Sequence, residues 1–541
     1  MDHILGFCYR ISFQFVAQRD KDGMARSFRS SQAVDTTLQV IRNSHVNFLL
    51  TSCLILIAAY LTVLAAFGRS FIHPFTEEVN TTVVGPNSDS SDLITSAFSI
   101  FFLLAVSLCV GKVFDYVSLP PLFGCLLVGL LVKNIHVFDA MFKVNPRWEW
   151  CIRTLALTVI LVRCGIGLSW ECLKEAMSVT LSLGILTAAI ESGAIALAAI
   201  FIFGWSVPIA LICGFVLAAI SPAVTVPVVL DLQSEGLGTR KGIPTLVLAS
   251  TTLDNIFCIT AFSVTTSVVF STDPLVEVIG VTVAQLVAGA FVGIVVGWIL
   301  WWFPISYVPN SSVCRTLLLV TIPSAMVLGG SALGLPSAGI VAAALLSFVA
   351  STKWKTDNDD KIAYEEKAFS LLWNLFFMPL LFALIGMKLD FSIMTWSTVL
   401  TGCALIGIGV VFRFLSGIAF SCCSDFSMKE QLVVALSLLP KATVQAALAP
   451  AIVAYAGTTS YYAEEAFVAQ TACILTILLT APIGQYILSK TAPLLLKNTR
   501  VVGIAKSSLE DMQFGGKGMN GHAVTTLATR IEEDPIRFQH F

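Results

Sequence analysis

The chain has 541 residues, of which 56% are hydrophobic and only 12% are charged, and its formal net charge is −2. Soluble globular proteins carry about 25% charged residues, so this composition excludes a soluble enzyme and gives no basis for a nucleic-acid partner. Apolar runs of roughly 18 to 25 residues recur along the chain, and each is long enough to cross a hydrocarbon core about 30 Å thick. Because backbone groups in lipid must be hydrogen-bonded within their own segment, we predict an all-α polytopic membrane protein in contact with lipid.

In chain order, residues 1–45 form a polar segment without the apolar stretch of a secretory signal, and we predict a cytosolic N-terminal tail. An extra transmembrane helix follows over 46–68, and a larger transmembrane domain occupies 93–489. Together they hold about fourteen spans of suitable length. Residues 490–541 are mixed and polar, as expected of a flexible cytosolic tail. No other segment is long enough for a catalytic domain, so we expect neither enzymatic activity nor a cofactor.

The basic residues of the short loops orient this topology. Lys241, Lys353 and Lys367 fall on the same side as both termini, which places the termini in the cytosol. The plasma membrane is the location we favour, with endosomal and mitochondrial membranes as alternatives. The first outer loop carries Asn80 in a glycosylation sequon, whereas the sequon at Asn310 falls on the cytosolic side and is expected to stay unmodified.

Ionisable residues deep inside apolar helices are costly in lipid and mark ion pathways or buried pairs. Histidine is absent between His136 and His522, which argues against haem or a histidine-ligated metal in the membrane. Proton transport would therefore depend on a carboxylate or a lysine. The ionisable residues that lie at this depth are Arg163, Glu191, Asp254, Arg413 and Lys441.

Two predicted spans carry proline where a helix would reach mid-depth. The sixth contains Pro222 and Pro227, and the thirteenth contains Pro440 directly before Lys441. Proline removes a backbone donor and leaves a carbonyl without its helical partner. Two ordinary proline kinks would explain either motif alone, but interrupted helices at matching places in two halves indicate an ion site at the bilayer midplane.

The positions of the breaks also indicate an inverted repeat. If spans three to seven form one five-helix unit and spans ten to fourteen the other, each broken helix is the fourth member of its unit, and the units run in opposite directions. The core helices then cover about 178–270 and 395–489. Glu191 and Arg413 are each in the third member, so we predict that they form a buried ion pair.

Four motifs follow one another along the chain, which are Ser221-Pro222-Ala223-Val224-Thr225-Val226-Pro227, Lys241-Gly242-Ile243-Pro244-Thr245-Leu246, Asp254-Asn255 and Pro440-Lys441-Ala442-Thr443-Val444-Gln445. By these motifs the chain, from about residue 152 to 485, resembles the NHA-type sodium/proton exchangers of animals, a branch of the cation/proton antiporter superfamily. The resemblance implies the sodium/proton antiporter fold with two crossed, broken helices, a homodimer of two-domain protomers, and exchange of Na⁺ or Li⁺ for H⁺ by elevator-like alternating access.

The resemblance also implies roles for single residues. Asp254 matches the first carboxylate of the family's paired-aspartate motif, Glu191 and Arg413 match its core salt bridge, and Lys441 matches the lysine beside the second crossover. The departure is Asn255, where relatives carry the second aspartate. An asparagine oxygen can coordinate a cation, but this side chain cannot take up a proton near neutral pH.

Three functions therefore stay open. In the first, the chain is a monovalent cation/proton antiporter in which Na⁺ binds at Asp254, with neutral oxygens from Ser221, Thr225 and Asn255. In the second, it is a proton-coupled chloride transporter in which Lys441 is the positive element. In the third, it is a homologue that keeps the fold without transporting.

Overall fold

The computed structural model describes residues 44–67, 90–117, 119–168, 174, 177–270, 275–305, 310–357, 362–422, 424–456 and 460–496. Helices make up the regular structure of these residues, and no strand occurs among them, as predicted. The glycosylation sequon at Asn80 lies outside the described residues, as do nearly all of the N-terminal tail and the C-terminal tail from residue 497 onward.

Eleven of the described helices are long and apolar enough to cross a membrane, and three shorter apolar helices lie at Leu49–Thr62, Pro121–Asn134 and Thr443–Ala456. A total of fourteen spans stays a prediction. The helices are α3 (Ser44–Phe67), α4 (Ser90–Tyr116), α5 (Pro121–Asn134), α6 (His136–Met141), α7 (Pro146–Gly167), α9 (Met177–Leu181), α10 (Thr187–Phe201), α11 (Val207–Ala218), α12 (Pro222–Ser234), α13 (Ile243–Val269), α14 (Leu275–Ile299), α15 (Ser311–Ala332), α16 (Pro336–Asp357), α17 (Ile362–Leu372), α18 (Met378–Gly386), α19 (Trp396–Ser421), α20 (Met428–Ser437), α21 (Thr443–Ala456) and α22 (Ala463–Leu495).

Local sequence accounts for many helix starts. Pro121, Pro146 and Pro222 each occupy the first turn of a helix, where proline's fixed φ is favourable and its missing N–H costs nothing. At the start of α20, Ser427 and Glu430 form a capping box, in which each side chain bonds to the backbone N–H of the other residue. The helix boundaries near the broken spans thus follow from residues visible in the sequence.

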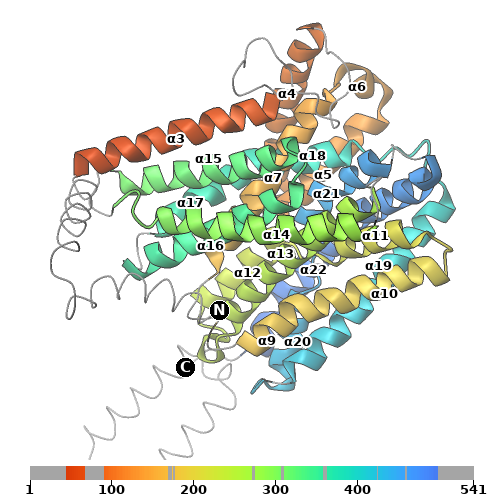
Figure 1. The fold of residues 1–541 in the computed structure, drawn as a ribbon. Coiled ribbons are helices and arrows are strands. Elements are labelled where there is room, and N and C mark those ends of the chain that lie inside the picture. Colours follow the sequence, from red (N-terminus) through yellow and green to blue (C-terminus); the bar gives the residue numbers. More distant parts are fainter. Residues whose placement is uncertain are drawn as a thin grey trace, which may run out of the picture.

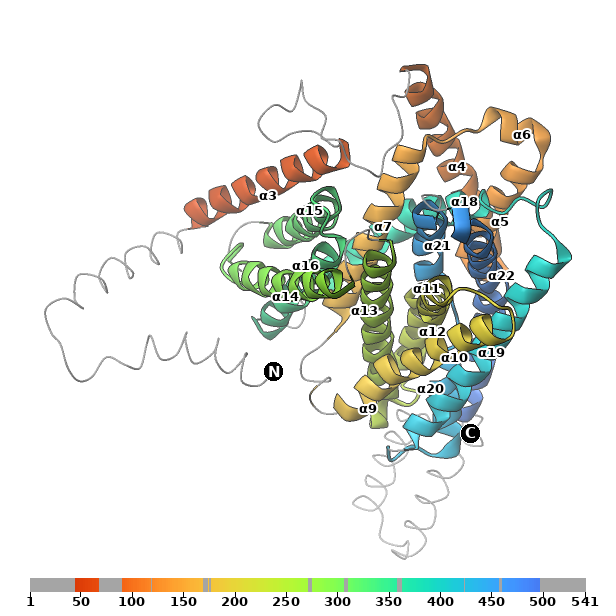
Figure 2. The ribbon, with the colours of Figure 1, turned by 45° about the vertical axis from the view of Figure 1, so that its right-hand side comes forward.

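Most of the helices form two groups that meet at α13, while α4, α5 and α18 pack on one another (Figures 1 and 2). In one group α14, α15 and α16 pack together with α7, and α3 lies along α15. The other contains α10, α11, α12 and α19 to α22. Glycine permits the closest packing in the first group, since a Cβ added at Gly289 of α14 would lie 2.4 Å from the carbonyl oxygen of Ala338 in α16.

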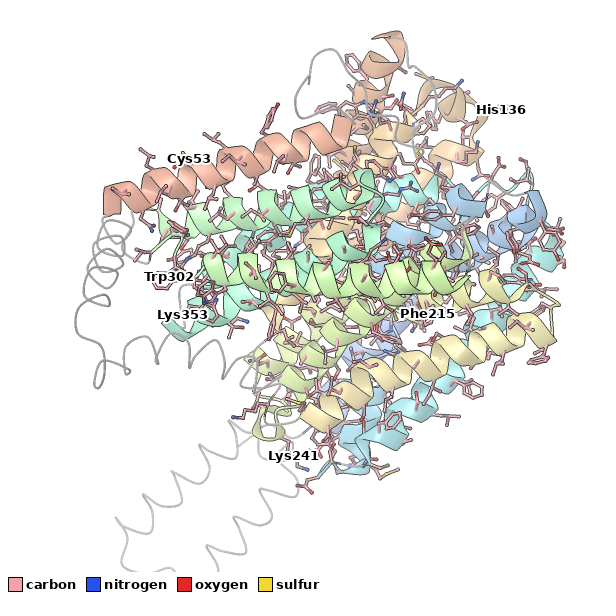
Figure 3. All side chains as sticks on the ribbon, viewed as in Figure 1. Cys53, His136, Phe215, Lys241, Trp302 and Lys353 are labelled. Carbon is pink, nitrogen blue, oxygen red and sulfur yellow. The ribbon has the colours of Figure 1, made fainter. Side chains whose placement is uncertain are left out.

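Polar contacts gather at two opposite ends of the bundle. Figure 3 shows Lys241, Trp302 and Lys353 on one side and His136 on the other, in keeping with the sides predicted for these loops. On the side of Lys241, its ammonium lies 2.8 Å from Glu430, which joins the start of α13 to the start of α20.

At the opposite end, the backbone N–H of Ser206 donates to Glu465 at 3.0 Å, which joins the start of α11 to the start of α22. Each contact therefore links a broken helix of one predicted unit to the fifth helix of the other. The same end carries Asp390, and hydrogen bonds donated by the side chain and backbone of Ser392 hold the pKa of its carboxyl below the ordinary value.

Candidate functional site

Two broken helices cross in the second group of helices. The α-helical backbone stops after Ala218 and resumes at Pro222, and it stops again after Ser437 and resumes at Thr443. The two non-helical stretches meet where the backbone N–H of Ser221 donates to the carbonyl of Pro440 at 2.8 Å. A second link runs from the Thr225 hydroxyl to the Ser437 carbonyl at 3.2 Å. Backbone groups freed by each break are thus partly satisfied by the other broken helix.

Gln445 and Lys441 cover the end of α11, where helical carbonyls have no partner within the helix. The Gln445 side-chain amide donates to the carbonyls of Val216 at 2.9 Å and Ala219 at 2.8 Å. The Lys441 ammonium donates to the carbonyl of Ala218 at 2.6 Å. Positive charge and donors at a helix C-terminus are favourable because the carbonyls there carry partial negative charge.

Four fully buried charged side chains lie at this crossing. The Arg413 guanidinium is 2.5 Å from one carboxylate oxygen of Asp254, and the other oxygen accepts the backbone N–H of Ile220 at 2.7 Å. The Lys441 ammonium is 2.7 Å from Glu191, whose carboxylate also lies 3.4 Å from Arg413. All four side chains are at most 2% exposed. Two acids and two bases give this charge cluster a formal charge of zero.

The predicted contact between Glu191 and Arg413 is present, but each residue has a nearer partner. Arg413 bridges both carboxylates with the two arms of its planar guanidinium, and its shorter contact is to Asp254. The sequence predicts no basic partner for Asp254, whereas the structure places it in an ion pair. A ligand that takes this carboxylate must therefore compete with the guanidinium.

Asn255 lies apart from the charge cluster. It follows Asp254 on α13, and successive helical side chains point about 100° apart. Its side chain is fully buried and neither amide atom has a hydrogen-bond partner, although the thiol of Cys164 on α7 lies beside it. Cys164 was not among the predicted site residues because a cysteine in an apolar helix is usually a packing residue.

Other polar atoms near the crossing are also buried without a hydrogen-bond partner. They are the hydroxyls of Ser221 and Thr443, the side-chain carbonyl of Gln445 and Nε of Arg413. Such atoms are rare in proteins, and each calls for an explanation. The crossing thus offers neutral oxygen ligands beside a carboxylate, as well as unused donors.

Broken helices that cross within a helical bundle, with paired buried charges at the crossing, define the class of secondary transporters with midplane ion sites. The family model described as "Sodium/hydrogen exchanger, transmembrane" matches residues 102–490, so the chain belongs to the sodium/hydrogen exchanger family.

Individual relatives agree with this assignment. The chain is 33% identical over 410 residues to sodium/hydrogen exchanger 9B2 of Xenopus tropicalis, with 74% of this chain and 75% of that one covered. It is 32% identical over 406 residues to sodium/hydrogen exchanger 9B1 of Homo sapiens, with coverage of 74% and 78%. The sodium proton antiporter MjNhaP1 of Methanocaldococcus jannaschii has the same fold, with a TM-score of 0.59 at 19% identity over 75% of this chain and 99% of that one. The predicted antiporter fold is therefore confirmed.

Proposed function

We propose that this protein exchanges a monovalent cation, Na⁺ or Li⁺, for H⁺, and that Asp254 is the carboxylate for which the two compete. The observation that supports this role is the fully buried Asp254 carboxylate, which accepts the backbone N–H of Ile220 at the first break. The hydroxyls of Ser221, next to Ile220 in sequence, and of Thr443, at the start of α21, are buried without partners. Hard cations prefer oxygen ligands of this kind. Thr225 and the Asn255 amide oxygen complete the set of candidate ligands.

The Arg413 guanidinium makes the binding of either substrate an exchange reaction. Because it already neutralises Asp254, a cation can bind only as the guanidinium moves away, and a proton on Asp254 weakens the same ion pair. Cation and proton then exclude one another, which is the requirement for antiport. Since each would add one positive charge to a cluster of zero formal charge, exchange of one for one is electroneutral.

The crossed helices supply the moving part in this proposal. The carboxylate is tied to the backbone of the first break through Ile220, and Lys441 is tied to α11 through Ala218. The crossing and α13 would therefore move as one body against α7 and α14 to α16, exposing the site alternately on each side of the membrane. We further propose a homodimer in the plasma membrane with both termini cytosolic, in keeping with Lys241 and Lys353 on one side of the bundle.

Proton flux in proteoliposomes tests this function. Imposed Na⁺ or Li⁺ gradients should move protons through the wild-type protein, and Asp254→Asn should abolish the flux. The double variant Asp254→Asn/Arg413→Gln removes one charge of each sign and keeps the charge cluster balanced, so it controls for misfolding and should also be inactive. Asp231→Asn, which changes an exposed carboxylate on α12, should keep wild-type flux. Absence of flux in the wild type under every gradient would instead favour a non-transporting homologue.

Unused donors at the crossing favour proton-coupled anion transport as a second candidate. The Asn255 side-chain nitrogen and Nε of Arg413 are buried without partners. A proton on Asp254 would leave the charge cluster with one net positive charge, which a chloride ion would neutralise. Proton and anion would then cross together, and both the empty and the doubly loaded site would carry no net charge.

The same assay separates the two candidates. In the antiporter, Na⁺ or Li⁺ gradients drive proton flux and replacing chloride by gluconate has no effect. In the anion transporter, a chloride gradient drives proton flux in the absence of Na⁺ and Li⁺, and Lys441→Ala abolishes it.

A further inference from the structure

Thr480 of α22 holds the backbone of the second break. Its hydroxyl accepts a hydrogen bond from the backbone N–H of Lys441 at 3.0 Å. The same hydroxyl lies 2.9 Å from the carbonyl of Thr476 in its own helix and 3.3 Å from the carbonyl of Lys441. A hydroxyl has one proton to donate, so it serves one of these carbonyls at a time while it accepts from Lys441. Thr480 thus provides the partner for a backbone N–H in the non-helical stretch between α20 and α21.

The face of α22 that carries Thr480 lies close to the second break. A Cβ added at Gly484, about one turn after Thr480, would lie 2.9 Å from Cγ of Pro440. The first break has a corresponding partner in α13, where the Asp254 carboxylate accepts the backbone N–H of Ile220. Each break is therefore held by the long helix that follows it in the chain, through a carboxylate in one unit and through a neutral hydroxyl in the other.

The position of the Lys441 backbone decides where its ammonium lies in the charge cluster. The ammonium contacts Glu191 at 2.7 Å and the carbonyl of Ala218 at 2.6 Å. Glu191 has a second basic partner in Arg413, at 3.4 Å, and Arg413 is also the ion-pair partner of Asp254. If Lys441 withdraws, the uncompensated Glu191 carboxylate attracts the guanidinium more strongly and draws it away from Asp254. A displacement at the second break is therefore passed to the carboxylate proposed to bind the cation.

We propose that Thr480 is a positioning residue for cation exchange, because it fixes the backbone from which the Lys441 side chain extends. With Lys441 held on Glu191, the guanidinium stays paired with Asp254 and competes with the cation. This inference rests on the proposed function. Removal of the Thr480 hydroxyl should make Na⁺ bind more tightly, whereas a general loosening of the fold would lower the maximal flux and leave the affinity for Na⁺ unchanged.

Proton flux against Na⁺ concentration, in proteoliposomes of the full chain, tests this role. Thr480→Val keeps the shape of the side chain but removes the hydroxyl, and it should lower the apparent KM for Na⁺ by about threefold to tenfold, as expected for the loss of one neutral hydrogen bond. Thr480→Ser keeps the hydroxyl and should keep the wild-type KM. The matched control is Thr476→Val, which removes a buried hydroxyl bonded to Ala472 at 2.8 Å within α22 and should leave KM unchanged. An unchanged KM in Thr480→Val, or an equal fall in Thr476→Val, would overturn the inference.

Hydrogen exchange supplies a readout that does not depend on transport. Mass spectrometry follows deuterium uptake in the peptide that spans Pro440 and Lys441. Uptake there should be several-fold faster in Thr480→Val than in the wild type, because the Lys441 N–H loses its partner, and it should stay at the wild-type rate in Thr480→Ser and Thr476→Val. If Thr480→Val does not fold, Thr480→Ala is measured in both assays with the same expectations. Wild-type uptake in the variants without the hydroxyl would show that Thr480 does not hold the break.

The two levels of the proposal fail in different ways. If no cation gradient moves protons through the wild-type protein, the proposed antiport is wrong and this inference falls with it. If Na⁺ drives exchange but Thr480→Val keeps the wild-type KM, antiport stands and only the role of Thr480 is wrong.

Discussion

Lys441 is the nearest partner of Glu191 in the charge cluster, at 2.7 Å, and both side chains are buried. Removing one partner leaves the buried charge cluster with one unbalanced charge, so Lys441→Met or Glu191→Gln alone should destabilise the protein by about 3–5 kcal/mol. The double neutral variant should recover much of this loss. Thermal unfolding in detergent measures the difference, with Lys112→Met, at a residue whose side chain is 82% exposed, as the control. Additive losses in the double-mutant cycle would show that the two residues are not coupled.

Asn255→Asp tests how the missing second carboxylate limits the site. The substitution adds one negative charge beside Asp254, so the apparent KM for Na⁺ should fall by about tenfold at matched pH. Asn255→Ser keeps the position neutral and should not produce this gain. Proton flux against Na⁺ concentration in proteoliposomes provides the measurement. In a chloride transporter, the added charge would instead suppress anion-driven flux.

At these positions the sequence predicted which charged residues are buried better than how they pair. A charged residue within a long apolar run is conspicuous, and Glu191, Asp254, Arg413 and Lys441 were recognised in this way. Their pairing depends on the rotation of each helix about its axis and on the reach of the arginine fork, which no short pattern encodes.

The broken helices depend on Gln445 as well as on proline. Gln445→Leu would keep a side chain of similar size but remove the donors that serve the carbonyls of Val216 and Ala219 at the first break. Unfolding should require about 1–3 kcal/mol less, because buried carbonyls lose their partners. Cation-driven flux should fall as the crossing loosens. Both quantities are measured on the same purified variant.

Gln285 on α14 provides the matched substitution for this test. Its side-chain oxygen, like that of Gln445, is buried without a hydrogen-bond partner. Because Gln285 lies on α14, outside the crossing, Gln285→Leu makes the same chemical change without affecting the first break. It should leave stability unchanged or slightly raised. Equal destabilisation by the two leucine substitutions would mean that the Gln445 contacts with α11 contribute little.

Proline accounts for where α12 starts, but not for the start of α21 at Thr443 or for how the two breaks fit together. Pro222 and Pro440 were visible as interruptions, and α12 does begin at Pro222. The hydrogen bond from Ser221 to Pro440 joins segments more than two hundred residues apart and follows from the crossing of the two units. Pro227 lies inside α12, so a proline in the sequence does not by itself locate a break.

For the whole molecule, composition was sufficient to predict a polytopic helical protein, whereas the number of spans is harder to obtain. α5 has 14 residues, and α21 is likewise only 14 residues long because its span is interrupted. Length alone therefore misses elements that complete the bundle. The relation between the two five-helix units could be predicted because the breaks and the buried charges occupy corresponding places in each.

Glycosylation tests the sidedness of the molecule. Asn47 of α3 contacts the backbone of Trp302 at 2.8 Å and of Ile305 at 3.0 Å, so the start of α3 lies on the same side as the residues that precede α15. Asn310 comes directly before α15 and thus belongs to this side, which also carries Lys353. Since α3 has 24 residues, enough to cross the bilayer, the sequon at Asn80 that follows it should face the opposite side.

We therefore expect a glycan at Asn80 and none at Asn310 when the protein is made in animal cells. Digestion with an N-glycosidase should increase gel mobility of the wild type, Asn80→Gln should already migrate at the digested position, and Asn310→Gln should behave as wild type. A glycan at Asn310 would place the start of α15 outside and would reverse the orientation of the bundle. Because α3 starts on the side of Asn310 and ends before Asn80, modification at both sequons would mean that α3 does not span the membrane.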